Sequence, residues 1–224
     1  MNILRSGNIK IKGNDNKPCC KIKPAVFYLF ALFSYPFFFF LSCTSSLPSQ
    51  TMEIPASERE ISEEIYLKSN SSAAFRVRIL KTSASLNDIT VIPENFESVN
   101  EPFIIKDADP VTSIFTADIN SDGYSELYII TVSAGSGSYS GIYAFASNKD
   151  KSVSPVYVKD FYEKGYRGHD RIFLKGNRLY RSFPLYKKDD KNCCPSGGTK
   201  TVQYRLIKGE ASWILEVDES DISK

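Results

Sequence analysis

Short runs of apolar and β-branched residues, several of them alternating with charged positions, recur through the last two thirds of the chain. In "FRVRIL", at 75–80, apolar and basic residues alternate, which is typical of a strand with one buried face. The later runs are "TSIFTAD" (112–118), "ELYIITV" (126–132), "GIYAFA" (141–146), "PVYVKDF" (155–161), "RIFLKGNRLYRSF" (171–183) and "TVQYRLIKGEASWILEV" (201–217). Their content of β-branched and aromatic residues predicts strands.

Turn residues connect these predicted strands into hairpins. Gly176 and Asn177 stand between two alternating segments, and Gly209 interrupts the last run in the same way. Both patterns predict that the chain reverses direction there. No helix-length apolar period separates the strands, which argues against a parallel α/β sheet. The fold class indicated is all-β, a single antiparallel β-sandwich or barrel-like domain over residues 73–224 with Trp213 in its core.

The first 42 residues have the order of an export signal, with basic residues before an apolar run. The run, from Ala25 to Leu41, has 17 residues, no charge and an internal proline, so it is poorly suited to a permanent transmembrane helix. The segment "FLSC" at 40–43 resembles the lipobox of bacterial lipoproteins. The resemblance implies that Cys43 is acylated and anchors an outer-membrane lipoprotein in the bacterial cell envelope, facing the periplasm or the surface. The alternative is a secreted protein with an incidental cysteine.

The segment from Cys43 to residue 72 is rich in Ser, Glu and Pro and poor in aromatic residues. This composition predicts a flexible linker between the lipid and the domain. A short helix over 56–69 is an alternative, because Ile61, Ile65 and Lys68 would share one face, but its apolar stripe is thin.

The charge of the whole chain, +2, depends on the N-terminal segment. Residues 1–42 hold six of the 28 Lys and Arg residues and one of the 26 Asp and Glu residues, so the remainder carries 22 basic and 25 acidic groups, a net charge of −3. The sequence shows no clustered basic segment. Nucleic acid is therefore not expected as a partner.

Two adjacent cysteines, Cys193 and Cys194, lie in the predicted domain. Consecutive Cα atoms are closer together than ordinary disulfide geometry favours, so a bond between these two would be strained. Two thiols also make a poor zinc site, because structural zinc takes four ligands. The segment "KNCCPSGG" is interpreted as a structural turn, with a vicinal or intermolecular disulfide as the alternative.

An acidic loop, "DINSDGYSE" at 118–126, leads into one of the predicted strands. Oxygen ligands at alternate positions and a glycine at the bend are typical of the beginning of a calcium-binding loop. The candidate ligands are Asp118, Asn120, Asp122, the backbone carbonyl of Tyr124, and Glu126. Ile129 stands where an EF-hand has its bidentate glutamate, so the loop is not an EF-hand. Two interpretations stay open, a structural Ca2+ and an Asx-turn with solvated carboxylates. Beyond this ion, the sequence requires no cofactor.

A loop of glycine and serine, "SAGSGSYSG" at 133–141, lies between two runs that would pair directly as strands. A two-residue turn would close this hairpin, so the extra residues predict a projecting loop that carries hydroxyls and one phenol. The loop has no Gly-x-Ser-x-Gly nucleophile elbow, and its glycines lack the spacing of a dinucleotide-binding loop. On composition alone, a flexible surface turn is an equally good interpretation.

The tip of this loop matches the Ser-Gly-x-Tyr motif of bacterial periplasmic lysozyme inhibitors; its residues are Ser136, Gly137, Ser138 and Tyr139. Together with "DINSDGYSEL" and "GGTKTVQYRLIKGEASWIL", the region from Phe115 to Leu215 is similar, with gaps, to inhibitors of invertebrate-type lysozyme. The resemblance implies that Ser136 and Tyr139 enter the lysozyme cleft and hydrogen-bond its catalytic carboxylates. It also implies a homodimer. Tyr162 and Tyr166 are a further hypothesis, a second contact loop.

The sequence predicts a binding protein and not an enzyme. His169 is the one histidine, and no Ser or Cys motif accompanies it, so a catalytic triad is not expected. A wall hydrolase with paired carboxylates is the weakest hypothesis. The leading hypothesis is a lysozyme inhibitor, with the invertebrate type as its first target. The alternative is a calcium-binding envelope lipoprotein that binds another host or envelope ligand.

Overall fold

The structure is a computed structural model that describes residues 9–10, 63–69, 71–98 and 101–219. The described residues form fourteen β-strands and no α-helix. The strands are β1 (Ile9–Lys10), β2 (Glu63–Lys68), β3 (Ala74–Lys81), β4 (Asn87–Glu94), β5 (Phe103–Ala108), β6 (Val111–Ala117), β7 (Glu126–Val132), β8 (Ser140–Ser147), β9 (Val153–Pro155), β10 (Tyr157–Val158), β11 (Arg171–Lys175), β12 (Arg178–Pro184), β13 (Thr199–Lys208) and β14 (Trp213–Val217).

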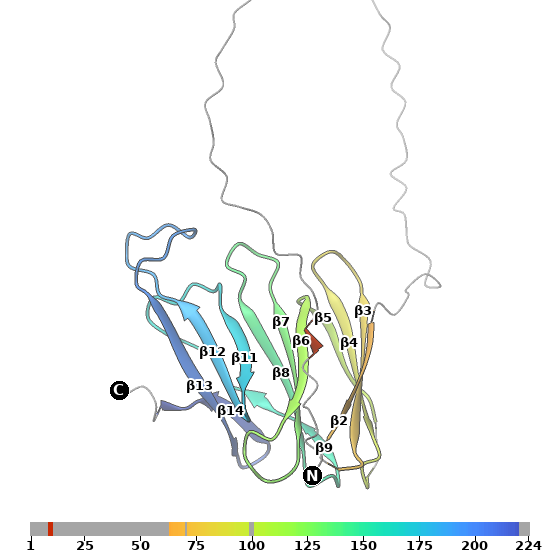
Figure 1. Ribbon diagram of the computed structural model, residues 1–224. Coiled ribbons are helices and arrows are strands. Elements are labelled where there is room, and N and C mark those ends of the chain that lie inside the picture. The colour runs from red at the N-terminus through yellow and green to blue at the C-terminus, as the bar shows by residue number, and fades with distance from the viewer. Residues whose placement is uncertain (1–8, 11–62, 70, 99–100, 220–224) are drawn as a thin grey trace, which may run out of the picture. The chain divides into compact units, whose positions relative to one another are not determined.

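Three sheets contain these strands (Figure 1). The central sheet has the order β1-β6-β7-β8-β9, the N-terminal sheet β2-β3-β4-β5, and the C-terminal sheet β10-β14-β13-β12-β11. Neighbouring strands are antiparallel, apart from the short parallel pair of β10 with β14. The prediction of an all-β, antiparallel fold of the β-sandwich type is therefore confirmed.

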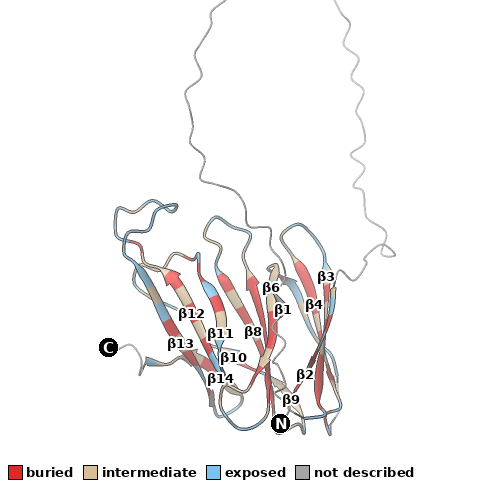
Figure 2. Ribbon diagram, in the orientation of Figure 1, coloured by how far each residue is buried: buried red, intermediate tan, exposed pale blue. Residues whose placement is uncertain are grey.

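The central sheet is covered on both faces. Successive residues of its strand β7 point to opposite sides of the sheet, and both sides are buried. Leu127 and Ile129 belong to a core shared with the N-terminal sheet. Tyr128 and Ile130 belong to a second core shared with the C-terminal sheet. Buried residues accordingly follow the strands of all three sheets (Figure 2). A strand buried on both faces is expected to be apolar almost throughout, as "ELYIITV" is.

The folded region begins earlier than the sequence predicts. The composition of residues 43–72 predicts a flexible linker, or a short helix over 56–69, whereas residues 63–68 form β2, antiparallel to β3. Ile65 and Leu67 of β2 enter the core of the N-terminal sheet. The linker and helix interpretations are therefore wrong for this stretch. The reason is that two alternating apolar residues are too few to separate a strand from a thin helical stripe.

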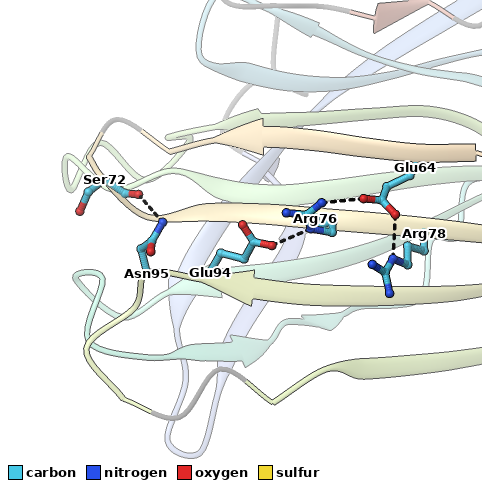
Figure 3. A network of polar contacts seen from close by, with 6 residues as sticks. All are labelled: Glu64, Ser72, Arg76, Arg78, Glu94 and Asn95. Atoms are coloured by element: carbon cyan, nitrogen blue, oxygen red, sulfur yellow. Dashed lines mark hydrogen bonds and ion pairs between the residues drawn. The ribbon is translucent and has the colours of Figure 1, made fainter.

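Ion pairs across the exposed side of the N-terminal sheet hold β2 in register (Figure 3). Glu64 of β2 accepts hydrogen bonds from Arg76 (2.6 Å) and Arg78 (2.8 Å) of β3, and these bonds lower the pKa of Glu64. Arg76 also donates to Glu94 of β4 at 2.6 Å. Cross-strand pairs of opposite charge favour one pairing register over its neighbours.

Two further strands, β4 and β5, form from segments in which the sequence pattern does not predict strands. β4 contains Pro93, a residue that usually argues against a strand inside a sheet. β5 is short and ends in Lys106, Asp107 and Ala108, which breaks the apolar alternation. Both strands are held by their neighbours in the N-terminal sheet, a tertiary effect that local propensity does not express.

Both predicted hairpins are present. Lys175 pairs with Arg178 across the turn at Gly176 and Asn177, and Lys208 pairs with Trp213 across the turn that begins at Gly209. Trp213, expected in the core, is only partly buried against the second core, and its indole N–H donates to the Asn148 side chain (3.1 Å).

Within the segment interpreted as an export signal, residues 9–10 form β1, which pairs with Ser113 and Ile114 of β6. This pairing differs from the expectation that residues 1–42 take no part in the folded domain. Without β1, β6 is an edge strand of the central sheet, and the backbone groups of an edge can pair with an added segment. The apolar run and Cys43 lie outside the described residues. Within the described part of the chain, no helix has the length and apolarity needed to cross a membrane.

Candidate functional site

The serine loop, defined here as residues 133–139, joins β7 to β8 at one end of the central sheet. Two hydrogen bonds close its neck: the Ser133 amide donates to the Tyr139 carbonyl (2.9 Å), and the Tyr139 amide donates to the Ser133 hydroxyl (3.0 Å). Nearer the tip, the Ser138 amide donates to the Gly135 carbonyl (3.0 Å). These bonds define the backbone path of the loop.

Tyr139 projects from this loop with 47% of its surface exposed. A Cβ atom on Gly137 would overlap its ring, and a Cβ atom on Gly168 would come within 3.3 Å of the Cδ1 atom of the ring. Tyr166 meets the ring edge to face, with 5.5 Å between the ring centroids. The ring is therefore held by two glycines and one tyrosine while the rest of its surface faces solvent. Gly137, part of the Ser-Gly-x-Tyr motif, is the residue that makes room for it.

Two neighbouring connections brace the tip of the serine loop. The His169 amide, from the β10–β11 connection, donates to the Gly137 carbonyl (2.7 Å). The Asn192 side chain, from the β12–β13 connection, donates to the Ser136 carbonyl (3.0 Å). Both acceptors are backbone carbonyls, so neither bond occupies the hydroxyl of Ser136 or Ser138. Within the loop, the Ser138 hydroxyl donates to the Gly135 carbonyl (3.4 Å). The loop is therefore held by its neighbours through its backbone, and the exposed Ser136 is not used by these two contacts.

A buried ion pair lies at the root of the loop. Arg181 Nη1 is 3.3 Å from Asp170 Oδ2, and the two side chains are 6% and 0% exposed. Asp170 Oδ1 accepts a hydrogen bond from the Ser140 amide (2.9 Å). Arg181 donates to the Ser140 carbonyl (3.3 Å) and to the Tyr166 hydroxyl (3.2 Å). The pair therefore fixes the first residue of β8 against β12 and the β10–β11 connection.

Tyr166 supports Tyr139 and is not itself an exposed contact. Its ring packs edge to face on Phe161 (4.9 Å between centroids) and on Phe183 (5.2 Å), and burial raises the pKa of its hydroxyl. Tyr162, next to Phe161 in the chain, is 89% exposed. Of the two tyrosines expected to form a second contact loop, only Tyr162 is freely accessible.

The sequence indicates the serine loop but not the residues that hold it. Asp170, Arg181 and Asn192 lie 30, 41 and 56 residues from their partners in or next to the loop. No local spacing connects residues so far apart. The one local signal is Gly168 before His169, since a glycine in an otherwise charged segment indicates either a left-handed backbone or a close approach.

Replacement of Gly168 by alanine is expected to destabilise the fold. Gly168 has a φ of +84°, and a Cβ atom there would overlap the Gly137 carbonyl, which no rotamer change can relieve. The left-handed backbone alone costs a non-glycine residue about 1 to 2 kcal/mol, and the overlap adds to this. Urea unfolding measures the loss. Gly176→Ala is the matched control, since Gly176 has a φ of +61° and open space around the added Cβ. Equal losses of unfolding free energy in the two variants would show that the overlap with the Gly137 carbonyl does not contribute to the destabilisation.

The acidic loop, residues 118–126, joins β6 to β7 at the other end of β7. Carboxylate oxygens of Asp118, Asp122 and Glu126 lie within 4.8 Å of one another. The Asp118 carboxylate accepts hydrogen bonds from the backbone amides of Asp122 (3.0 Å) and Gly123 (2.9 Å), which curl the loop around it. The structure thus brings the three predicted carboxylates together.

The other two predicted ligands contact Asp122. Asn120 accepts a hydrogen bond from the Asp122 amide (3.0 Å) and donates to the Asp122 carboxylate (3.1 Å), and the Tyr124 amide donates to the same carboxylate (2.9 Å). Ile129 is fully buried in the core of the N-terminal sheet. Its position agrees with the exclusion of an EF-hand.

Glu126 is the buried member of the acidic loop, with no exposed surface. Its Oε2 atom accepts hydrogen bonds from the Ile119 amide (3.2 Å) and the Tyr128 hydroxyl (3.5 Å). Its Oε1 atom is buried and has no hydrogen-bond partner among the described residues. Burial raises the pKa of Glu126 to about 8; the Ile119 amide opposes this shift, and the carboxylates of Asp122 and Asp118 add to it.

The remaining candidates take structural positions. Cys193 and Cys194 are exposed, with their Sγ atoms 2.7 Å apart, and the Cys194 amide donates to the Lys191 carbonyl (2.9 Å), so these residues form a turn as the sequence indicates. His169 contributes its backbone amide to the serine loop, and its ring lies beside that of Tyr186.

Comparisons with protein-family models, with curated proteins and with solved structures found no match. The tip of the serine loop, residues 136–139, presents hydroxyls, backbone groups and an aromatic ring without any charge. Such a surface is suited to recognising hydrogen-bonding groups in a narrow groove and is poorly suited to acid–base or nucleophilic catalysis.

Proposed function

We propose that the protein inhibits lysozyme by inserting the serine loop into the active-site cleft. The observation that carries the proposal is the state of Tyr139, half-exposed and yet held by Gly137, Gly168 and Tyr166. A tyrosine buried in the core could not reach a partner. The family resemblance of residues 136–139 supplies the identity of that partner, with invertebrate-type lysozyme as the first target.

The chemistry of a glycosidase cleft suits a neutral, hydroxyl-bearing loop. Such a cleft contains one carboxylic acid, which can donate a hydrogen bond, and one carboxylate, which accepts. Serine and tyrosine hydroxyls can do both. Because they carry no charge, they avoid the large desolvation cost that a buried lysine or arginine would add. Ser136 and Tyr139 are the two residues expected to make these bonds.

The bracing of the serine loop supports tight binding. A loop that must be ordered when it binds loses affinity, typically about 0.5 to 1.5 kcal/mol for each side chain immobilised. Here the neck bonds, the His169 and Asn192 contacts and the packing around Tyr139 order the loop beforehand. Most of the binding energy of the aromatic ring would then appear as affinity.

The proposed site of action is the bacterial cell envelope, where an inhibitor would protect the cell wall. This location depends on acylation of Cys43, which the sequence predicts. The two acyl chains of a lipoprotein anchor it stably, whereas one chain does not. Replacement of Cys43 by serine is expected to move the protein from the membrane fraction to the soluble fraction of lysed cells, and unchanged fractionation would argue against the lipid anchor.

Titration against lysozymes tests the proposed function. The chain from Thr44 onward, which keeps β2 to β14, is added to invertebrate-type, chicken-type and goose-type lysozyme acting on peptidoglycan. Inhibition of at least one type, lost in Ser136→Ala and Tyr139→Ala, is the expected result. Tyr157→Ala is the matched control, since Tyr157 is 59% exposed and lies outside the serine loop, in β10, where it pairs with Ile214 of β14. Absence of inhibition with all three types would refute the proposal.

Replacement of Gly137 by alanine is expected to weaken inhibition while leaving the fold intact. The added Cβ would overlap the Tyr139 ring, which can swing away because it is half-exposed. Restoring the ring on binding should raise the inhibition constant roughly 2- to 10-fold. Thermal melting serves as the control and should change little. Gly135→Ala, where the added Cβ meets no atom, is expected to inhibit like the wild type.

A further inference from the structure

The acidic loop has the dimensions of a coordination shell. Carboxylate oxygens of Asp118, Asp122 and Glu126 lie within 4.8 Å of one another. Ca2+ binds oxygens at 2.3–2.6 Å, so oxygens on opposite sides of one ion are about 5 Å apart. The three groups could therefore share a single ion. Among the described residues, none of the ion pairs involves any of these three carboxylates.

The burial of Glu126 is an independent indication of a ligand. This side chain has no exposed surface, and its Oε1 atom has no hydrogen-bond partner in the described part of the chain. A buried polar oxygen without a partner is costly, and a buried charge more so, unless a cation or a set of donors compensates it. An exposed Asx-turn explains the positions of Asp118 and Asp122, which are not buried. It does not explain why the Glu126 carboxylate is buried beside them.

We propose that the acidic loop binds one Ca2+ ion through the carboxylates of Asp118, Asp122 and Glu126. All three donors are oxygens, which suit Ca2+, Mg2+ and Mn2+ better than metals that favour nitrogen or sulfur ligands, such as zinc and copper. Mg2+ demands near-octahedral geometry and keeps much of its water, whereas Ca2+ accepts irregular sets of six to eight oxygens. Oxygens of Asn120, of the Tyr124 carbonyl and of water are available to complete such a set.

The ion would brace the junction between two sheets. The acidic loop is already tied to the residue after β2, because the Ser125 amide donates to the Ser69 hydroxyl (3.4 Å). The preceding strand β6 is also tied to β2, because the Thr116 hydroxyl donates to the Lys68 carbonyl (3.4 Å). Holding the three carboxylates together would therefore stabilise the β6–β7 hairpin and its contact with the N-terminal sheet. The serine loop begins at the other end of β7, roughly 20 Å away along the strand, so the ion has no direct part in the proposed inhibition.

Thermal melting of the full chain in mild detergent, after treatment with a chelator, tests the site. Added CaCl2 at 100 times its dissociation constant is expected to raise the melting temperature by roughly 5 to 10 °C. An equal concentration of MgCl2 should raise it much less. Equilibrium dialysis with radioactive Ca2+ gives a second measurement that does not depend on unfolding, and about one ion per chain is expected.

Variants separate the site from a general effect of the ion. Glu126→Gln, Asp118→Asn and the exposed Asp122→Asn should each lose most of the shift and the bound Ca2+. Because Gln has no charge to bury, Glu126→Gln without Ca2+ should melt no lower than the chelator-treated wild type. Glu101→Gln, an exposed residue outside the loop, should respond like the wild type. No shift and no bound ion in the wild type, an equal response to Mg2+, or a full response in the variants would overturn the proposal.

Discussion

Replacement of Tyr139 by alanine is expected to raise the inhibition constant for lysozyme about 30-fold or more. An aromatic anchor at the centre of an interface typically contributes about 2 kcal/mol or more, and each 1.4 kcal/mol corresponds to about a tenfold change in affinity. Tyr139 has the required accessibility, and its support by Gly137, Gly168 and Tyr166 stays in place when the ring is removed. Enzyme assays at several inhibitor concentrations measure the constant.

Tyr139→Phe separates the contribution of the ring from that of the hydroxyl. A hydrogen bond to a charged group contributes about 1.5 to 3 kcal/mol, so loss of a bond between the phenol and a catalytic carboxylate should weaken inhibition roughly 10- to 100-fold. If Tyr139→Phe inhibits like the wild type, the hydroxyl does not reach a carboxylate and the ring acts as an apolar wedge. An unchanged constant in Tyr139→Ala would remove the serine loop from the binding surface altogether.

The parts of the fold that could be predicted from the sequence are those that local residues determine. Gly176 and Asn177 impose a turn between two alternating segments, and the hairpin forms there. The run from Glu126 to Val132 forms a strand because its residues suit burial on both faces. In contrast, "EEIYLK" is a strand only because β3 pairs with it and its two apolar residues find a core.

The arrangement of the sheets could not be predicted in the same way. Alternation along β7 indicates that Leu127 and Tyr128 face opposite sides, but it does not say what covers each side. In the structure, the N-terminal sheet covers one side and the C-terminal sheet covers the other. That pairing depends on residues far apart in the chain, so the sequence predicts a β-sandwich, as the structure confirms, without predicting which sheets pack on each other.

The candidate sites likewise contain parts that the local sequence predicts and parts that only the fold brings together. The acidic loop is local, and its three carboxylates meet as their spacing indicates. The tip of the serine loop is also local. The structure explains the glycine of its motif, because a side chain at Gly137 would overlap the ring of Tyr139. The supports of the loop come from distant segments. Asp170 and Arg181 resemble ordinary surface charges in the sequence, and only the fold buries them together beneath Ser140.

Replacement of Asp170 by alanine is expected to produce the largest loss of stability, about 3 to 5 kcal/mol. The substitution leaves the Arg181 guanidinium, which is 6% exposed, without its carboxylate, and it also removes the acceptor of the Ser140 amide. For a chain of this size, such a loss lowers the melting temperature by roughly 6 to 20 °C. Urea unfolding and thermal melting measure the two quantities. Glu163→Ala is the control, because its ion pair with Lys200 is more exposed and should matter far less.

A second substitution shows whether the loss arises from an uncompensated charge. The double variant Asp170→Ala with Arg181→Met removes the stranded guanidinium and fills its place with an apolar chain, so it should recover part of the stability that Asp170→Ala loses. It should not recover inhibition fully, because Arg181 also donates to the Ser140 carbonyl and the Tyr166 hydroxyl, which set the root of the serine loop. If the double variant is less stable than Asp170→Ala, the packing and hydrogen bonds of Arg181 outweigh its charge. If Asp170→Ala itself loses less than about 1 kcal/mol, the pair behaves as a solvated surface pair, and the serine loop is then positioned chiefly by its own neck and by Gly168.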